Sequence, residues 1–136
     1  MKIQTICFLF LSVIVLVLAG CGGGDNYAKV EWSGTVTLNG KPIPANTTAT
    51  IMVSAGESAT ATHATQAEIA NGRYTLKDVP QGKVFVQFSI VQEIPPTDPA
   101  DVARGVRTTK SLLPKKFNGF SENADKSDSQ KNFDIK

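Results

Sequence analysis

The strongest constraint on the fold of this chain is the alternation of apolar and polar residues in KVFVQFSIV, residues 83–91. Successive side chains of a strand point to opposite faces, so a period of two indicates an extended strand. One face of this strand is entirely apolar: Val84, Val86, Phe88 and Ile90. Phe85 and Val91 make the other face partly apolar, which is typical of a strand inside a sheet. We therefore predict a central strand at residues 83–91.

The same period of two recurs in VEWSGTVTL, residues 30–38. Its apolar face consists of Val30, Trp32, Val36 and Leu38. Gly34 falls in the same series, and a glycine at such a position lets another backbone or a bulky ring approach closely. Further strands are expected at residues 48–54 (Ala49, Ile51 and Val53 inward), in a segment ending near Ala70, at 73–78 (Tyr74 and Leu76 inward) and at the C-terminus (Phe133 and Ile135 on one face).

Turn signals separate these segments. Asn39-Gly40 and Asn71-Gly72 predict hairpin turns, because both residue types tolerate positive φ. Pro80-Gln81-Gly82 predicts another turn. Pro42 and Pro44 exclude a central strand after the first turn.

Two polar segments, residues 95–111 and 118–131, are expected to be loops. The first can hold one short helical turn capped by Asp98, with Pro99 at the first helical position. About six or seven short strands with tight turns predict an all-β sandwich.

The N-terminus has the pattern of a secretory signal peptide. A positive start, Met1-Lys2, precedes an apolar run of 13 residues, 6–18, that only Ser12 interrupts. A membrane-spanning helix needs about 20 apolar residues, so an uncleaved membrane anchor is the weaker alternative.

The four residues that end this run, Leu18, Ala19, Gly20 and Cys21, resemble the lipobox of bacterial lipoproteins. The resemblance implies that the Cys21 sulfur receives a diacylglycerol thioether, that a peptidase recognises residues 18–20 and cuts before Cys21, and that an acyl chain such as palmitate modifies the new amine. The alternative is an ordinary secreted protein with a stray cysteine near the cut. The expected organisation is therefore a signal peptide at 1–20, a lipidated cysteine with a flexible tether at 21–28, and one domain at 29–136.

A second resemblance lies in the domain. SGTVTLNGKPIPANTTATI and NGRYTLKDVPQGKVFVQF resemble two hallmarks of the carboxypeptidase regulatory-like, or transthyretin-like, β-sandwich domains. This implies an Ig-like or transthyretin-like (prealbumin-like) sandwich. Collagen-adhesin B-type repeats and starch-binding-like sandwiches share similar hallmarks. LLPKKFN and the final NFDIK resemble the tail of small secreted lipoproteins of planctomycete-type bacteria. Relatives that hydrolyse hydroxyisourate need histidines and a C-terminal Tyr-Arg-Gly-Ser, whereas this chain ends in FDIK and has one histidine.

Candidate chemistry is sparse. His63 is the single imidazole and has no readable partner, so we expect an exposed or edge histidine rather than a catalytic or metal-binding one. Glu122, Asp125 and Asp128 lack the spacing of a calcium loop, which favours a solvated loop. The sequence therefore predicts no catalytic residues, no metal site, no enzyme activity and no cofactor apart from the covalent lipid on Cys21.

The remaining candidates concern binding. A net charge of +2 is too small to predict a nucleic-acid partner. A loose basic run could contact anionic head groups or an acidic partner: Arg104, Arg107, Lys110, Lys115 and Lys116. Phe117 and Phe120 are the only plausible aromatic platform for a glycan.

Two functional hypotheses follow from these features. The first is a non-catalytic lipoprotein whose lipid anchor holds a β-sandwich at the bacterial cell envelope, on the periplasmic or surface side of the outer membrane rather than the inner, for binding or structural interaction with an envelope protein or glycan. The alternative is a carbohydrate-binding module of the starch-binding-like type.

Overall fold

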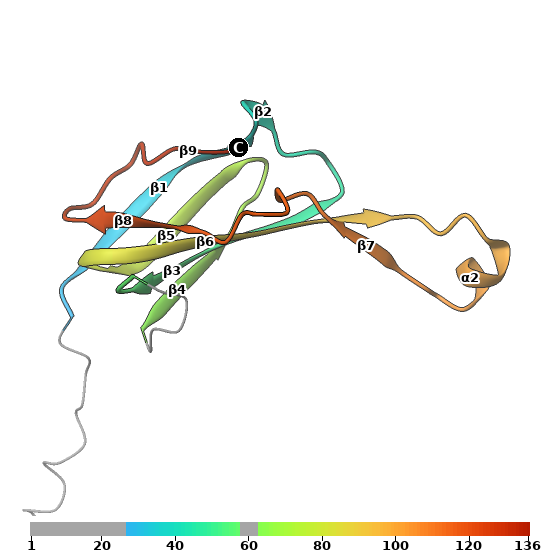
Figure 1. The fold of residues 1–136 in the computed structure, drawn as a ribbon, viewed down its shortest axis with the longest axis horizontal. Coiled ribbons are helices and arrows are strands. Elements are labelled where there is room, and N and C mark those ends of the chain that lie inside the picture. Colours follow the sequence, from blue (N-terminus) through green and yellow to red (C-terminus); the bar gives the residue numbers. More distant parts are fainter. Residues whose placement is uncertain (1–26, 58–62) are drawn as a thin grey trace, which may run out of the picture.

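The computed structural model describes residues 27–57 and 63–136. They form strands in two sheets and one short helix (Figure 1), which confirms the prediction of an all-β protein. The elements are β1 (Lys29–Leu38), β2 (Lys41–Pro42), β3 (Thr47–Ala55), β4 (Ala64–Glu68), β5 (Arg73–Pro80), β6 (Gly82–Ile94), α2 (Pro99–Ala103), β7 (Thr108–Ser111), β8 (Phe120–Ala124) and β9 (Phe133–Ile135). The predicted signal peptide and the segment that resembles a lipobox, residues 1–21, lie outside the described residues.

The smaller sheet is built around β1. Strands β2 and β5 pair antiparallel with β1, and β9 runs parallel to it, with Val36 opposite Phe133 and Leu38 opposite Ile135. The predicted Asn39-Gly40 turn joins β1 to β2, with φ values of 51° and 71°. The C-terminal strand therefore completes the sheet that the first strand begins.

The larger sheet is built around β6, which is the central strand that its alternation predicts. Strand β3 pairs with one edge of β6 from Ala55 to Thr47. The other edge pairs with β8 near the start of β6 and with β7 near its end. Strand β4 pairs with the outer edge of β3.

The core fills the space between the two sheets. The predicted inward faces of β1, β3, β5, β6 and β9 are confirmed, since their apolar residues are buried there: Trp32, Val36, Ala49, Ile51, Val53, Tyr74, Leu76, Val84, Val86, Phe88, Ile90, Phe133 and Ile135. The rings of Trp32, Tyr74, Phe88 and Phe120 surround Phe133, with centroids 5.5–6.4 Å away.

The prediction of a hairpin at Asn71-Gly72 is only partly right. Both residues have positive φ, 53° and 73°, and the main chains of Ala70 and Arg73 exchange two hydrogen bonds. Beyond that bridge the strands separate, because β4 pairs with β3 in the larger sheet and β5 pairs with β1 in the smaller one. The turn is therefore a corner between the two layers.

The prediction of loops at 95–111 and 118–131 is wrong for two segments, β7 and β8. Their composition is mostly polar and their strands are short, so alternation alone does not distinguish them from loop. They become strands because the free edge of β6 supplies backbone partners along Gly82–Val86 and Val91–Ile94. The predicted helical turn is confirmed as α2, which lies between β6 and β7, with the Asp98 carboxylate accepting a hydrogen bond from the Ala100 N–H at 2.8 Å.

Gly34 makes room for the C-terminal segment, as its place in the apolar series of β1 suggests. A Cβ at Gly34 would overlap the Lys131 carbonyl. Tyr74 lies opposite Gly34 on β5, and its hydroxyl donates a hydrogen bond to that carbonyl at 2.6 Å. Burial, followed by the negative charge of Asp128, raises the pKa of Tyr74 well above its ordinary value.

We expect Tyr74→Phe to lower the free energy of unfolding by about 1–2 kcal/mol, because the Lys131 carbonyl loses its donor. Tyrosine ionises near pH 10 in an unfolded chain, and Tyr74 stays protonated to higher pH when folded. Its contribution is therefore complete below about pH 10 and is lost as the pH rises further. Urea unfolding between pH 7 and 11 measures both effects, and a phenylalanine variant that loses stability as steeply as the parent above pH 10 would contradict this assignment.

Candidate functional site

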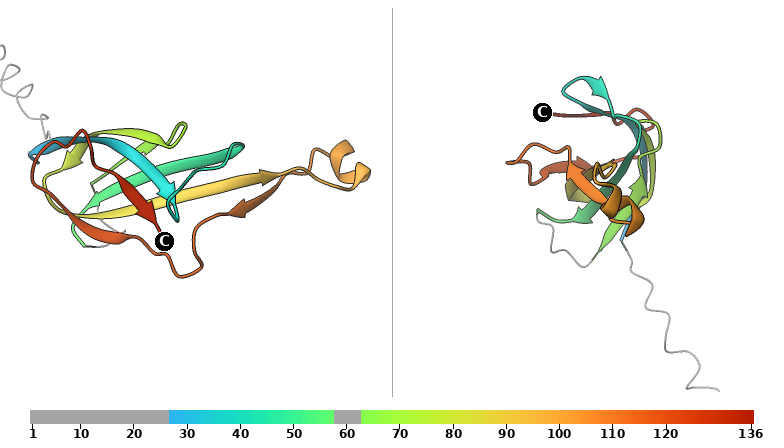
Figure 2. Two further views of the ribbon diagram at one scale, coloured as in Figure 1. Left: turned by 90° about the horizontal axis from the view of Figure 1, so that it is seen from above. Right: turned by 90° about the vertical axis from the view of Figure 1, so that its right-hand side faces the viewer.

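A projecting arm dominates the shape of the molecule. Pairing of β3 with β6 ends at Gln92, opposite Thr47, while β6 and the chain after it continue outward, turn through α2 and return along β7 (Figures 1 and 2). We call residues 93–110 the arm. Its base is a ladder in which Glu93 faces Thr109 and Ile94 faces Thr108.

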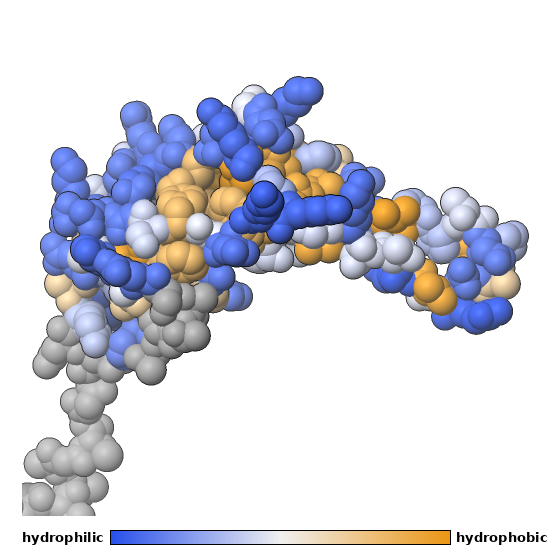
Figure 3. Space-filling model, viewed as in Figure 1, coloured by the Kyte–Doolittle hydropathy of each residue, from blue (hydrophilic) through white to orange (hydrophobic). Residues whose placement is uncertain are grey.

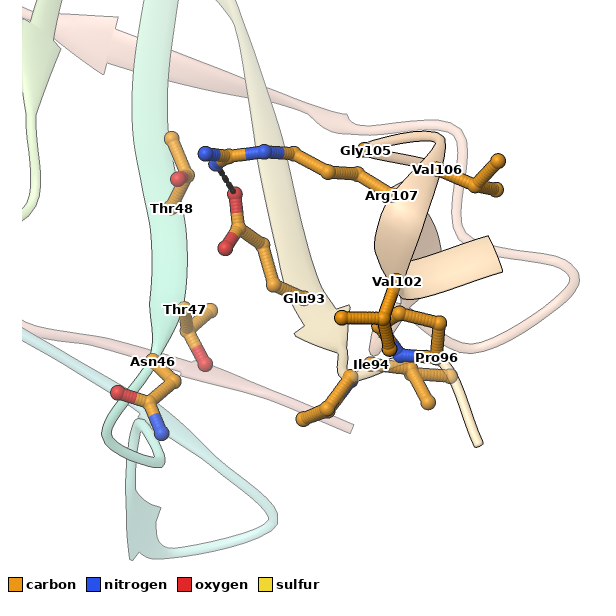
Figure 4. A pocket seen from close by; sticks show the side chains of 11 residues that line it. Asn46, Thr47, Thr48, Glu93, Ile94, Pro96, Val102, Gly105, Val106 and Arg107 are labelled. Atoms are coloured by element: carbon orange, nitrogen blue, oxygen red, sulfur yellow. Dashed lines mark hydrogen bonds and ion pairs between the residues drawn. The ribbon is translucent and has the colours of Figure 1, made fainter. Parts of the chain in front are cut away.

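The arm and the start of β3 enclose an open groove of about 630 Å³. One wall is polar and belongs to Asn46, Thr47 and Thr48 (Figure 4). The other comes from the arm and is largely apolar: Ile94, Pro95, Pro96, Val102, Gly105 and Val106, with Glu93 and Arg107. The Thr47 hydroxyl oxygen is buried and makes no hydrogen bond to the described residues.

The arm exposes large apolar side chains to solvent. Ile94 is 40% exposed, Val106 41% and Val102 60%. Among the residues that the structure describes, the only other large apolar side chain exposed to this degree is Tyr27, which lies elsewhere in the molecule. Figure 3 shows apolar surface on the arm as well as on the body of the sandwich. Exposed apolar residues that gather on one projection indicate an interaction surface.

The basic run predicted from the sequence is divided by the fold. Arg107 pairs with Glu93 at 3.1 Å, and Arg104 lies 4.0 Å from Asp101. Lys110 lies on β7, and the exposed Lys115 and Lys116 follow in the separate connection to β8. These five cations therefore do not form one basic surface.

The two residues of the predicted aromatic platform lie at the edge of the hydrophobic core. Phe117 and Phe120 are partly buried and pack against the core, where both rings lie 6.1–6.3 Å from Phe88. Both rings therefore pack against another ring of the core.

The side chains considered above as catalytic or metal-binding candidates contact neighbouring residues of the domain. The His63 ring lies 4.4 Å from the Tyr27 ring. Glu122 pairs with Lys131 at 3.1 Å, and the Asp128 carboxylate accepts a hydrogen bond from the Gln130 N–H. Within residues 27–57 and 63–136, no three His, Cys, Asp or Glu side chains gather as a metal site would require.

The chain enters the sandwich at the end remote from the arm. The Gln81 N–H donates to the Ala28 carbonyl at 2.8 Å, so residue 28 lies beside the start of β6. The 13 residues of β6 span about 40 Å from there to the base of the arm. No helix in the described part of the chain has the length and hydropathy needed to cross a bilayer.

Sequence reasoning missed the groove and the apolar surface of the arm. Ile94, Val102 and Val106 lie in a polar segment without periodicity, so no pattern predicts their exposure. One signal in the sequence could have found them. Apolar residues that belong to no alternating series are not predicted to lie in the core, so their exposure could have been expected.

Comparison of the chain with protein-family models, with curated proteins and with solved structures finds no match.

Proposed function

We propose that this chain is a lipoprotein anchored to a bacterial membrane through Cys21, and that its non-catalytic β-sandwich presents the arm for interaction at the cell envelope. The observation that carries the anchor is the sequence Leu18-Ala19-Gly20-Cys21 at the end of a short apolar run. Several lipid chains on one residue hold a protein at a bilayer firmly, whereas one chain holds it only marginally.

The position of the arm supports the second half of the proposal. Ala28 is seven positions after Cys21 along the chain, so the tether reaches at most about 25 Å. The sandwich then places the arm at the opposite end of β6, about 40 Å further on. The sandwich separates the anchor from the exposed apolar surface of the arm. The arm can therefore contact a partner at a distance from the membrane that holds Cys21.

The finer fold assignment belongs to the same proposal. We assign the sandwich to the Ig-like or transthyretin-like kind found in carboxypeptidase regulatory-like domains. The two motifs behind that resemblance both lie at connections between strands: NGKP forms the turn from β1 into β2, and VPQG leads from β5 into β6. The alternative, a carbohydrate-binding module, has weaker support because Phe117 and Phe120 pack against the core.

The anchor is tested by Cys21→Ser in a bacterium that processes lipoproteins. We expect the parent chain to fractionate with the outer membrane and to incorporate labelled palmitate, and the variant to lose the label. Ser12→Ala, inside the signal peptide, is the matched control and should leave both properties unchanged. Equal labelling of the parent and the Cys21 variant would contradict the proposal.

A further inference from the structure

The charges of the arm are segregated along the chain. All of its acidic residues come first: Glu93, Asp98 and Asp101. All of its basic residues follow: Arg104, Arg107 and Lys110. The outgoing limb is therefore acidic and the returning limb is basic, while the arm as a whole is neutral.

These charges remain accessible within one copy. The side chains of the Arg107–Glu93 pair are 78% and 56% exposed, and those of the Arg104–Asp101 pair are 71% and 41% exposed. Ion pairs this exposed contribute little to stability, so their members can exchange partners at little cost. The apolar residues Ile94, Val102 and Val106 lie on the same projection and are exposed as well.

We propose that two copies of this chain associate through their arms about a two-fold axis that runs along the arms. A two-fold axis in this direction sets each acidic limb against the basic limb of the other copy, because the rotation exchanges the limbs. The contact is self-complementary in charge, and the apolar side chains of both copies are removed from water together. Both arms point the same way, so both N-terminal ends lie on the same side and two anchors can enter one membrane.

Because the net charge of the arm is zero, we expect its partner to be a second copy of the chain rather than an anionic membrane surface. An anionic bilayer would attract the returning limb and repel the outgoing limb to a similar degree. The arm is also short, and a contact limited to it falls below the roughly 800 Å² per partner of a standard interface. We therefore expect weak association in solution, with a Kd in the range of about 10 μM to 1 mM, which confinement to a membrane would strengthen.

Residues 22–136 suit the test, since both cysteines of the chain precede them. They also contain the fold, because every buried apolar residue of the described part lies between Trp32 and Ile135. The test therefore does not depend on the lipid anchor. Sedimentation analysis up to about 1 mM protein covers the expected affinity.

We expect a reversible dimer for the parent and an association at least about tenfold weaker for Val102→Asp with Val106→Asp, at an unchanged melting temperature. Tyr27→Asp is the matched control, because Tyr27 is a comparably exposed large side chain away from the arm, and it should dimerise like the parent. A parent that stays monomeric throughout, or a Tyr27 variant as impaired as the arm variant, would overturn the proposal.

Charge reversal tests the charge complementarity of the contact. Glu93→Lys with Asp101→Lys makes the arm entirely basic apart from Asp98, and Arg104→Glu with Arg107→Glu makes it entirely acidic apart from Lys110. Each variant alone should be monomeric, whereas an equimolar mixture should form a heterodimer that high salt weakens. Failure of the mixture to associate, or binding of the parent arm to phosphatidylglycerol vesicles without dimerisation, would show that the partner is not a second copy.

Discussion

Replacing Gly34 by alanine is expected to lower the free energy of unfolding by about 3 kcal/mol, since overpacking costs about 1–3 kcal/mol and a disrupted buried hydrogen bond adds about 1. The new Cβ would overlap the Lys131 carbonyl, which is backbone and cannot rotate away. Relief requires the C-terminal segment to move from β1, and this movement disturbs the hydrogen bond that the Tyr74 hydroxyl donates to the same carbonyl. Urea unfolding followed by the fluorescence of Trp32, the single tryptophan, measures the loss.

Gly40→Ala separates this overlap from the general cost of replacing a glycine. A Cβ at Gly40 would meet nothing within 4 Å, although φ is +71° there. The expected cost is therefore only the left-handed backbone strain, about 1–2 kcal/mol. If Gly40→Ala proved more damaging than Gly34→Ala, close approach of the C-terminal segment would not be the reason for Gly34.

Phe133→Ala is expected to cost about 3–5 kcal/mol, the usual range for removing a buried phenylalanine. Phe133 is 8% exposed, and its ring lies within 6.4 Å of four other aromatic rings, which come from both sheets. Its removal opens a cavity where the C-terminal strand closes the sandwich. Thermal and urea unfolding should both show the loss.

Lys136→Ala is the control for Phe133→Ala. The Lys136 side chain is 80% exposed and lies 3.6 Å from Asp134, so its removal should change stability by less than about 0.5 kcal/mol. A Phe133 variant as stable as the Lys136 variant would mean that the C-terminal strand contributes little to the core.

The strands with strong alternation could be predicted from the sequence because burial on one face requires a period of two. Val84, Val86, Phe88 and Ile90 have no other arrangement that buries all four on one side. Gly34 could be predicted for a related reason, since a missing side chain in an apolar series implies that something else fills its place.

The pairing of the strands beyond the hairpin of β1 and β2 could not be predicted. Asn71-Gly72 has the same dihedral preferences whether it joins paired strands or crosses between layers, so the sequence cannot distinguish a hairpin from a corner. β7 and β8 were missed because each depends on a free edge of β6 rather than on its own pattern.

The candidate site was predicted only in outline. Residues 95–111 stood out as a long segment, but the shape of this segment depends on the ladder between β7 and the end of β6 and on the Asp98 cap. The basic residues could be recognised in the sequence, but the ion pair of Arg107 with Glu93 could not. Glu93 lies outside the basic run, and the register of the arm brings it close to Arg107.

The most direct test of the central claim is mass spectrometry of the mature N-terminus of the protein, extracted from the membrane of a bacterium that expresses the whole chain. The expected first residue is Cys21, with a diacylglycerol thioether on its sulfur and an acyl chain on its amine. An unmodified N-terminus at any other residue, or an intact Met1, would contradict it.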